Sequence, residues 1–278
     1  MFSSHTLLFK VCDFYKQSRQ VQTRLKQSNF GIFRLVVIAR LFIGGNRKVK
    51  KIKIHSEPLY AFAIILLGFA VALLSSAGFG VSMVVAPAYI LSLKTGFLTF
   101  GQAEYVIQSV LFVVFCCVMK RFKIVYLSSF LTCLIYGAVL DLFRMLPSFN
   151  QNITKPEALP FALRIGMFVL GAVLTSLSIA MFFKTYFYPQ VYDFFVKGVS
   201  AKFGIKRTVF KTAFDLTCLA ASTVMTLVFF KKFVGINIGT LIIAALNGTV
   251  IGMFGKLIDK YFEVVPIFKN FAKKFELG

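Results

Sequence analysis

Residues 58–93 form a run of 36 residues without a single charged side chain. A continuous α-helix of that length would measure about 54 Å, whereas the hydrocarbon core of a bilayer is about 30 Å thick. The run must therefore be broken, and Gly78 and Gly80 relax the backbone at a suitable point. We predict a first membrane span over about 58–77, followed over 81–93 by a proline-containing half-helix or re-entrant segment.

Five further long apolar stretches follow, and the composition agrees with a membrane protein. Hydrophobic residues make up 58% of the chain and charged residues 15%, against about 45–50% and about 25% in ordinary soluble domains. A soluble enzyme, a disordered chain and a disulfide-stapled secreted module are excluded by this balance. The predicted fold is all-α, a polytopic membrane protein with six transmembrane helices, the later ones at about 104–119, 124–146, 165–183, 209–230 and 233–255.

The net charge of +22 would suggest nucleic acid in a soluble protein, but here its distribution across the spans explains it. With six spans, 26 of the 32 Lys and Arg residues fall on one side and six on the other. Cytoplasmic loops are enriched in Lys and Arg. We therefore predict that both termini face the cytoplasm, and we expect no nucleic-acid partner.

Residues 1–57 are predicted to be a basic amphipathic cytoplasmic leader. Its 12 Lys and Arg residues are interspersed with Phe, Leu, Val and Ile, which favours a helix lying on a bilayer surface and held by anionic lipids. A disordered basic tail is the alternative. Residues 263–278 are expected to form a second basic cytoplasmic tail.

The membrane part contains an internal repeat. A shift of 103 residues matches Gly68 with Gly171 among ten identities in 40 positions, and farther on a shift of 111 matches Gly137 with Gly248. The repeats are assigned to 58–146 and 161–262, joined by a linker loop at 147–160. Three spans in each repeat make the two halves face opposite ways, an inverted arrangement typical of secondary transporters. A duplicated scaffold without a substrate is the alternative.

Two sequence stretches carry a resemblance to a known family. They are the turn and short helix AGFGVSMVVAPAYILS at 77–92 and the segment GTLIIAALNGTVIG at 239–252. Over 58–262 the chain resembles the YczE/YyaS/YitT family of bacterial membrane proteins. The resemblance implies a protein of the bacterial plasma membrane, often taken to be a transporter, and implies no reaction, substrate or cofactor. Residues 184–189 depart from that pattern, since KTYFYP replaces a glycine-rich turn.

Recognisable catalytic and phosphate-binding motifs are absent from the sequence, and both histidines lie outside the predicted spans. We therefore expect no enzyme, no cofactor and no metal site. Polar groups at membrane depth are costly and usually face a bundle interior or a cavity, and glycines can free backbone groups for a ligand. The candidate substrate-binding residues are Asp215, Lys211, Gln108, Glu104, Tyr105, Asn247, Gly78 and Gly80.

Lys211 and Asp215 are one helical turn apart and are expected to pair. Two functions fit these features. The first is a transporter or exporter of a small solute; the second is a non-transporting scaffold or regulator that binds a partner protein or lipid. A polar cavity lined from both halves would favour transport, and a fully packed bundle would favour the scaffold. A homo-oligomer is compatible with either function.

Overall fold

The computed structural model describes residues 51–120, 126–150, 154–268 and 272. The chain divides into two compact units, Met1–Lys50 and Lys51–Gly278, and the described residues belong to the second. Most of the predicted basic leader, and most of the tail at 263–278, lie outside the described residues.

The described part is almost entirely helical, which confirms the predicted fold class. Six of its helices are long and apolar enough to cross a membrane. These are α3 (Ser56–Ala77), α5 (Phe100–Met119), α6 (Leu127–Arg144), α7 (Phe161–Phe182), α9 (Arg207–Phe230) and α10 (Ile238–Tyr261). The shorter elements are α4 (Ala86–Thr95), α8 (Val191–Phe203), the 3-10 turns η2 (Pro147–Phe149) and η3 (Pro156–Ala158), and the strands β1 (Ile52–His55) and β2 (Phe262–Val265).

The long apolar run breaks where its glycines predict a break. Helix α3 ends at Ala77, and Gly78 and Gly80 follow with φ angles of 73° and 98°. Helix α4 then spans ten residues, about 15 Å, which is half the thickness of a hydrocarbon core. The second half has the same order of helices, long, short, long and long, although residues 183–190 break the chain there without a glycine.

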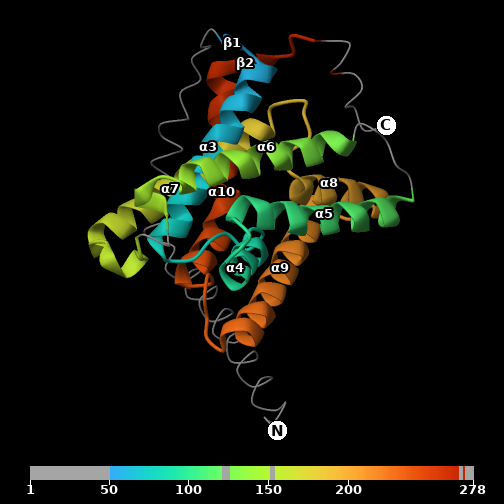
Figure 1. The fold of residues 1–278 in the computed structure, drawn as a ribbon. Helices are drawn as coiled ribbons and strands as arrows, with labels where there is room; N and C mark the ends of the chain where they lie inside the picture. The colour runs from blue at the N-terminus through green and yellow to red at the C-terminus, as the bar shows by residue number, and fades with distance from the viewer. Residues whose placement is uncertain (1–50, 121–125, 151–153, 269–271, 273–278) are drawn as a thin grey trace, which may run out of the picture. The chain divides into compact units, whose positions relative to one another are not determined.

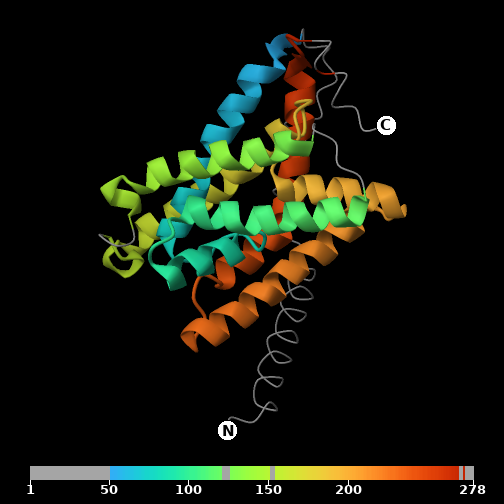
Figure 2. The same cartoon turned by 45° about the vertical axis from the view of Figure 1, so that its right-hand side comes forward.

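The contacts between helices repeat when the two halves are exchanged. Helix α3 packs against α7; α6 packs on α3 as α10 packs on α7; and α4 contacts α5 and α9 as α8 contacts α9 and α5. Figures 1 and 2 show α5 and α6 side by side in both views. The clearest exception is the α5–α6 contact, because α5 packs along α6 whereas α9 and α10 barely touch.

Local backbone geometry supports the same correspondence. Lys120 and Lys231 are the two non-glycine residues in the described part with positive φ, at 51° and 54°. They end α5 and α9 respectively, and the shift of 111 residues aligns them. The second-half copies are longer, since α8 has 13 residues against ten in α4, and α9 has 24 against 20 in α5.

The termini of the helices meet in two groups, one at each end of the described bundle. At one end Glu57 accepts hydrogen bonds from Tyr186 and from the backbone of Ile267, and Lys184 pairs with Asp259 at 2.5 Å. Strands β1 and β2 pair in parallel there, so α3 begins and α10 ends at the same end (Figure 1). The predicted leader at 1–57 and tail at 263–278 did not anticipate this pairing.

At the other end the break after α3 contacts the first turn of α7 and the N-cap residue of α10. Asn237 Nδ2 donates to the Gly78 carbonyl at 3.2 Å, and Arg164 Nε donates to the Ala77 carbonyl at 3.0 Å. At each end, the residues that meet are ones that the six-span topology places on the same side of the membrane.

Helix α5 buries two polar side chains and exposes several apolar ones. Glu104 and Gln108 are fully buried, whereas Val106, Val110 and Val113 are 43–61% exposed. An exposed apolar stripe of this kind is compatible with lipid and unfavourable in water. The described bundle therefore has the character of a membrane-embedded protein.

Candidate functional site

The described bundle contains a cavity of about 290 Å³ that is lined by both halves. The first half contributes α3, the segment at 81–85 and Tyr136 of α6, and the second half contributes α7, α8, α9 and α10. Cavities that hold small ligands typically begin at about 300 Å³. The cavity lies where α9 and α10 are apart, in the position that the α5–α6 contact fills in the first half.

Three charged side chains meet on one side of the cavity. Lys211 Nζ lies 3.5 Å from Asp215 Oδ1, as the spacing on α9 predicted, and 3.3 Å from Asp193 Oδ1 of α8. All three residues line the cavity. Two carboxylates share one ammonium group, so with all three groups ionised the cluster carries a net charge of −1.

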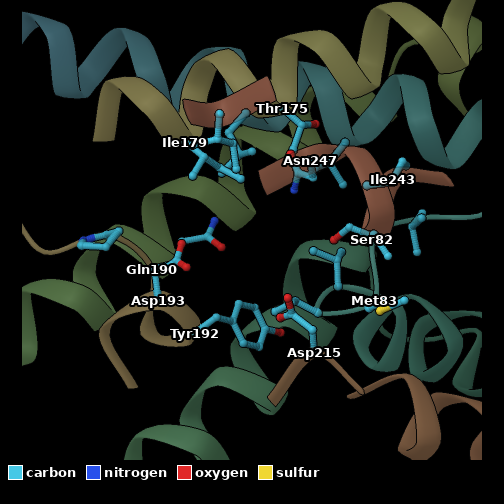
Figure 3. Close-up of a pocket in the computed structure, with 18 of the residues that line it drawn as sticks. Ser82, Met83, Thr175, Ile179, Gln190, Tyr192, Asp193, Asp215, Ile243 and Asn247 are labelled. Carbon is cyan, nitrogen blue, oxygen red and sulfur yellow. The ribbon is translucent and has the colours of Figure 1, made fainter. Parts of the chain in front are cut away.

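Three buried polar groups at the cavity have no hydrogen-bond partner in the described structure. They are the Tyr136 hydroxyl, Thr175 Oγ1 and Gln190 Nε2. Buried polar atoms are normally satisfied by protein, water or a ligand. Figure 3 shows Gln190, Asp193, Tyr192 and Asp215 around the open space, with Thr175 on the opposite side.

Asn247 also lines the cavity, as its position in the sixth span suggested. Its Oδ1 accepts a hydrogen bond from Ser176 Oγ at 2.8 Å, which joins α10 to α7. The side chain therefore contributes both to helix packing and to the polar lining. Gly248, the next residue, lines the same cavity, and a Cβ built there meets no atom within 4 Å.

Glu104 and Gln108 lie one layer behind the lining, connected to it through α8. Glu104 Oε2 accepts hydrogen bonds from Gln108 Nε2 and from the Tyr192 hydroxyl, both at 2.9 Å. Gln108 Oε1 accepts from the backbone N–H of Val191 at 3.2 Å. Tyr192 lines the cavity, whereas Glu104 and Gln108 do not.

The remaining three candidates do not line the cavity. Tyr105 donates to the Leu134 carbonyl at 2.8 Å and packs against Gly137, so it joins α5 to α6. Gly78 ends α3. Gly80 makes a close approach to α10, because a Cβ there would lie 2.4 Å from Thr240 Oγ1. The structure thus gives all three a role in packing or chain direction.

Sequence reasoning missed several lining residues, above all Asp193, Tyr192, Gln190 and Thr175. Asp193 had a usable signal, because it is a carboxylate in the short second-half segment that aligns with α4. Gln190 and Thr175 had none, since single polar residues in apolar helices are common and only the fold shows that these two face one space.

The cavity can hold a ligand that carries positive charge and hydrogen-bonding groups, since its lining combines a net negative cluster with polar and apolar side chains. In the described part of the chain no group of three or more His, Cys, Asp or Glu side chains is placed to hold a metal ion.

Comparison with known proteins places the chain in a family. Residues 54–256, from the start of the first repeat to the last turns of α10, match the model of a family of unknown function, DUF6198. The chain is a member of the DUF6198 family. The match covers every residue that lines the cavity of this DUF6198 protein and leaves out most of the basic leader. No curated protein matches it, and no solved structure does.

Proposed function

We propose that this DUF6198 protein transports a small cationic solute across the membrane. The observation that carries the proposal is the cavity, because both halves line it and its charged cluster has one negative charge in excess. Buried polar groups without partners add hydrogen-bonding capacity for a solute. A scaffold would gain nothing from a cavity of this kind, which costs packing and leaves buried polar groups unsatisfied.

The proposed mechanism is alternating access between two inverted repeats. The exchange-symmetric helix contacts and the two short helices support it, because transporters of this architecture bind solute where the repeats meet. The proposed likeness to the YczE/YyaS/YitT family agrees with such a role. In this scheme α8 and α9, which hold the charged cluster, move with the second repeat relative to the first.

We further propose that the protein resides in a bacterial plasma membrane with both termini in the cytoplasm. The 26-to-6 distribution of Lys and Arg supports this orientation, and the basic leader would add contacts with anionic lipids. Single cysteines at Lys155 and Lys184 test it in a cysteine-free background. An impermeant thiol reagent added to intact cells should label only Lys155→Cys, and labelling of Lys184→Cys alone would reverse the orientation.

The transport proposal is tested by uptake of labelled putrescine, choline and arginine into proteoliposomes, with succinate and sorbitol as non-cationic references. At least one of these three cationic nitrogen compounds, grouped below as the amines, should enter faster than into empty vesicles. Asp215→Asn should reduce that flux more than tenfold, because it removes the excess negative charge. Thr217→Ala is the matched control on α9, since Thr217 is exposed and away from the cavity.

Two results of this experiment would count against the proposal. Wild-type flux in a well-assembled Asp215→Asn variant would remove the cluster from the site. Failure of the wild-type protein to move any of the three amines would favour the scaffold or regulator instead.

A further inference from the structure

Glu104 occupies an environment that a permanently ionised carboxylate would not tolerate. Its exposure is 0%, at the junction of α5, α6 and α8. Oε2 accepts hydrogen bonds from Gln108 Nε2 and the Tyr192 hydroxyl, whereas Oε1 is buried with no hydrogen-bond partner in the described structure. An anion held there would leave one charged oxygen unsolvated and unpaired.

The titratable groups around Glu104 supply no positive charge. Cys133 and Tyr136 of α6 and Tyr192 of α8 are the side chains that interact with it electrostatically. All three are neutral when they carry their protons, and Gln108 on the same helix is neutral at any pH. Lys, Arg and His side chains in the described part of the chain form no ion pair with Glu104. With no positive group beside it, the buried carboxyl group is neutralised most simply by a proton.

Glu104 is linked to the cavity through α8. Tyr192, which donates to Glu104, lines the cavity, and the next residue, Asp193, binds Lys211. Gln108 binds Glu104 through its amide nitrogen and the first N–H of α8 through its oxygen. Adding or removing charge at Glu104 therefore acts directly on the helix that carries one carboxylate of the solute cluster.

We propose that Glu104 is a proton-binding site that couples proton movement to the position of α8 and hence to solute binding in the cavity. In the arrangement described here the proton is on Oε1. When α8 moves away and water reaches the carboxyl group, Glu104 releases that proton to water on the side of the membrane to which the cavity is then open, and becomes an anion. Before α8 returns, Glu104 takes up one proton from water on the opposite side. The coupling rests on the proposed transport function, whereas the protonated carboxyl group itself can be tested without any solute.

Infrared spectroscopy of the purified protein in lipid vesicles tests the site directly. The wild-type spectrum should contain the carbonyl stretch of a buried, protonated carboxylic acid, and Glu104→Gln should lose that band. Ser109→Ala is the matched control on α5, because Ser109 donates only to the Tyr105 carbonyl of its own helix, and it should keep the band. A spectrum in which Glu104→Gln removes only carboxylate-anion bands would overturn the proposal.

A second variant keeps the test decisive if Glu104→Gln fails to assemble. Tyr192→Phe leaves Glu104 in place but removes one of the two hydrogen bonds to Oε2, so the carbonyl band should shift to higher wavenumber. An unshifted band in the folded Tyr192→Phe protein would mean that the band does not come from Glu104, and the assignment would fail.

Proton movement with a trapped pH indicator tests the coupling. With putrescine, choline or arginine as the driving solute, wild-type vesicles should show solute-dependent proton movement, and Glu104→Gln should show at least tenfold less. Solute-dependent proton movement in Glu104→Gln at the wild-type rate would overturn the coupling. Amine flux without the infrared band would overturn the proton site alone, while the band without any amine flux would overturn the transport function alone.

Discussion

The helix pair α5–α6 and its repeat counterpart α9–α10 have corresponding sequences but opposite packing. In the first half, Gly137 lies so close to α5 that a Cβ there would be 2.3 Å from Tyr105 Cε1. A Cβ added at Gly101 would likewise collide with the Gly137 carbonyl oxygen. In the second half, Gly248 aligns with Gly137 and has open space around it. One pair is therefore a closed contact, and the other borders the cavity.

A single carboxylate accounts for part of this difference. Asp141 of α6 accepts hydrogen bonds from the Gly101 N–H at 2.8 Å and from Thr99 Oγ1 at 2.5 Å, so it fastens α6 to the first turn of α5. The shift of 111 places Gly252 at the corresponding point of α10. Without that side chain the second-half pair has no equivalent link, and its charged residues are free to face a shared space.

The largest effect is expected from filling the closed contact. Gly137→Leu places a branched side chain where even a Cβ has no room, and overpacking of this kind costs about 1–3 kcal/mol. The variant should lose most of its monodisperse, folded fraction in detergent, as measured by fluorescence-detected size exclusion. Normal assembly would show that α5 and α6 are not tightly packed.

Filling the space between α9 and α10 should affect function and leave assembly intact. Gly248→Leu adds a side chain next to Asn247 in empty space, so we expect a folded protein whose amine flux falls more than tenfold. Flux and size-exclusion profile are measured on the same preparation, with Thr217→Ala as control. Unchanged flux in this variant would mean that solute does not pass between α9 and α10.

The carboxylate link should give a smaller, purely structural effect. Asp141→Ala removes the acceptor for two donors at the start of α5, which should cost about 1–2 kcal/mol of stability. Asp259→Ala, which breaks an exposed pair with Lys184, should cost about 1 kcal/mol or less. Thermal unfolding in detergent compares the two, and an equal or larger loss in Asp259→Ala would contradict the role given to Asp141.

The smallest effect is expected from Gly248→Ala. A helix-interior glycine costs about 1 kcal/mol relative to alanine, and the added methyl group meets nothing within 4 Å. The variant should therefore unfold at the same temperature as wild type or slightly higher. A marked loss of stability would show that α10 is packed at this point.

The sequence predicts the helices well and the cavity poorly, for physical reasons. The thickness of a bilayer and the cost of charge within it determine where α3 ends, at Ala77 as expected. The repeat predicts the order of helices but not that α9 and α10 separate, because that depends on the missing counterpart of Asp141. Lys211 and Asp215 were found because they share one helix, whereas Asp193 joins them from another.

Accessibility of position 248 tests most directly whether the space between α9 and α10 is a solute site. Gly248→Cys is compared with Ser129→Cys, a near-isosteric change at a fully buried site in α6, each in a background without native cysteines. A small water-soluble thiol reagent should label Gly248→Cys and not Ser129→Cys, and whichever of putrescine, choline and arginine is transported should slow that labelling severalfold. Equal resistance of both cysteines, or labelling of Gly248→Cys at a rate that none of the three amines changes, would contradict the account.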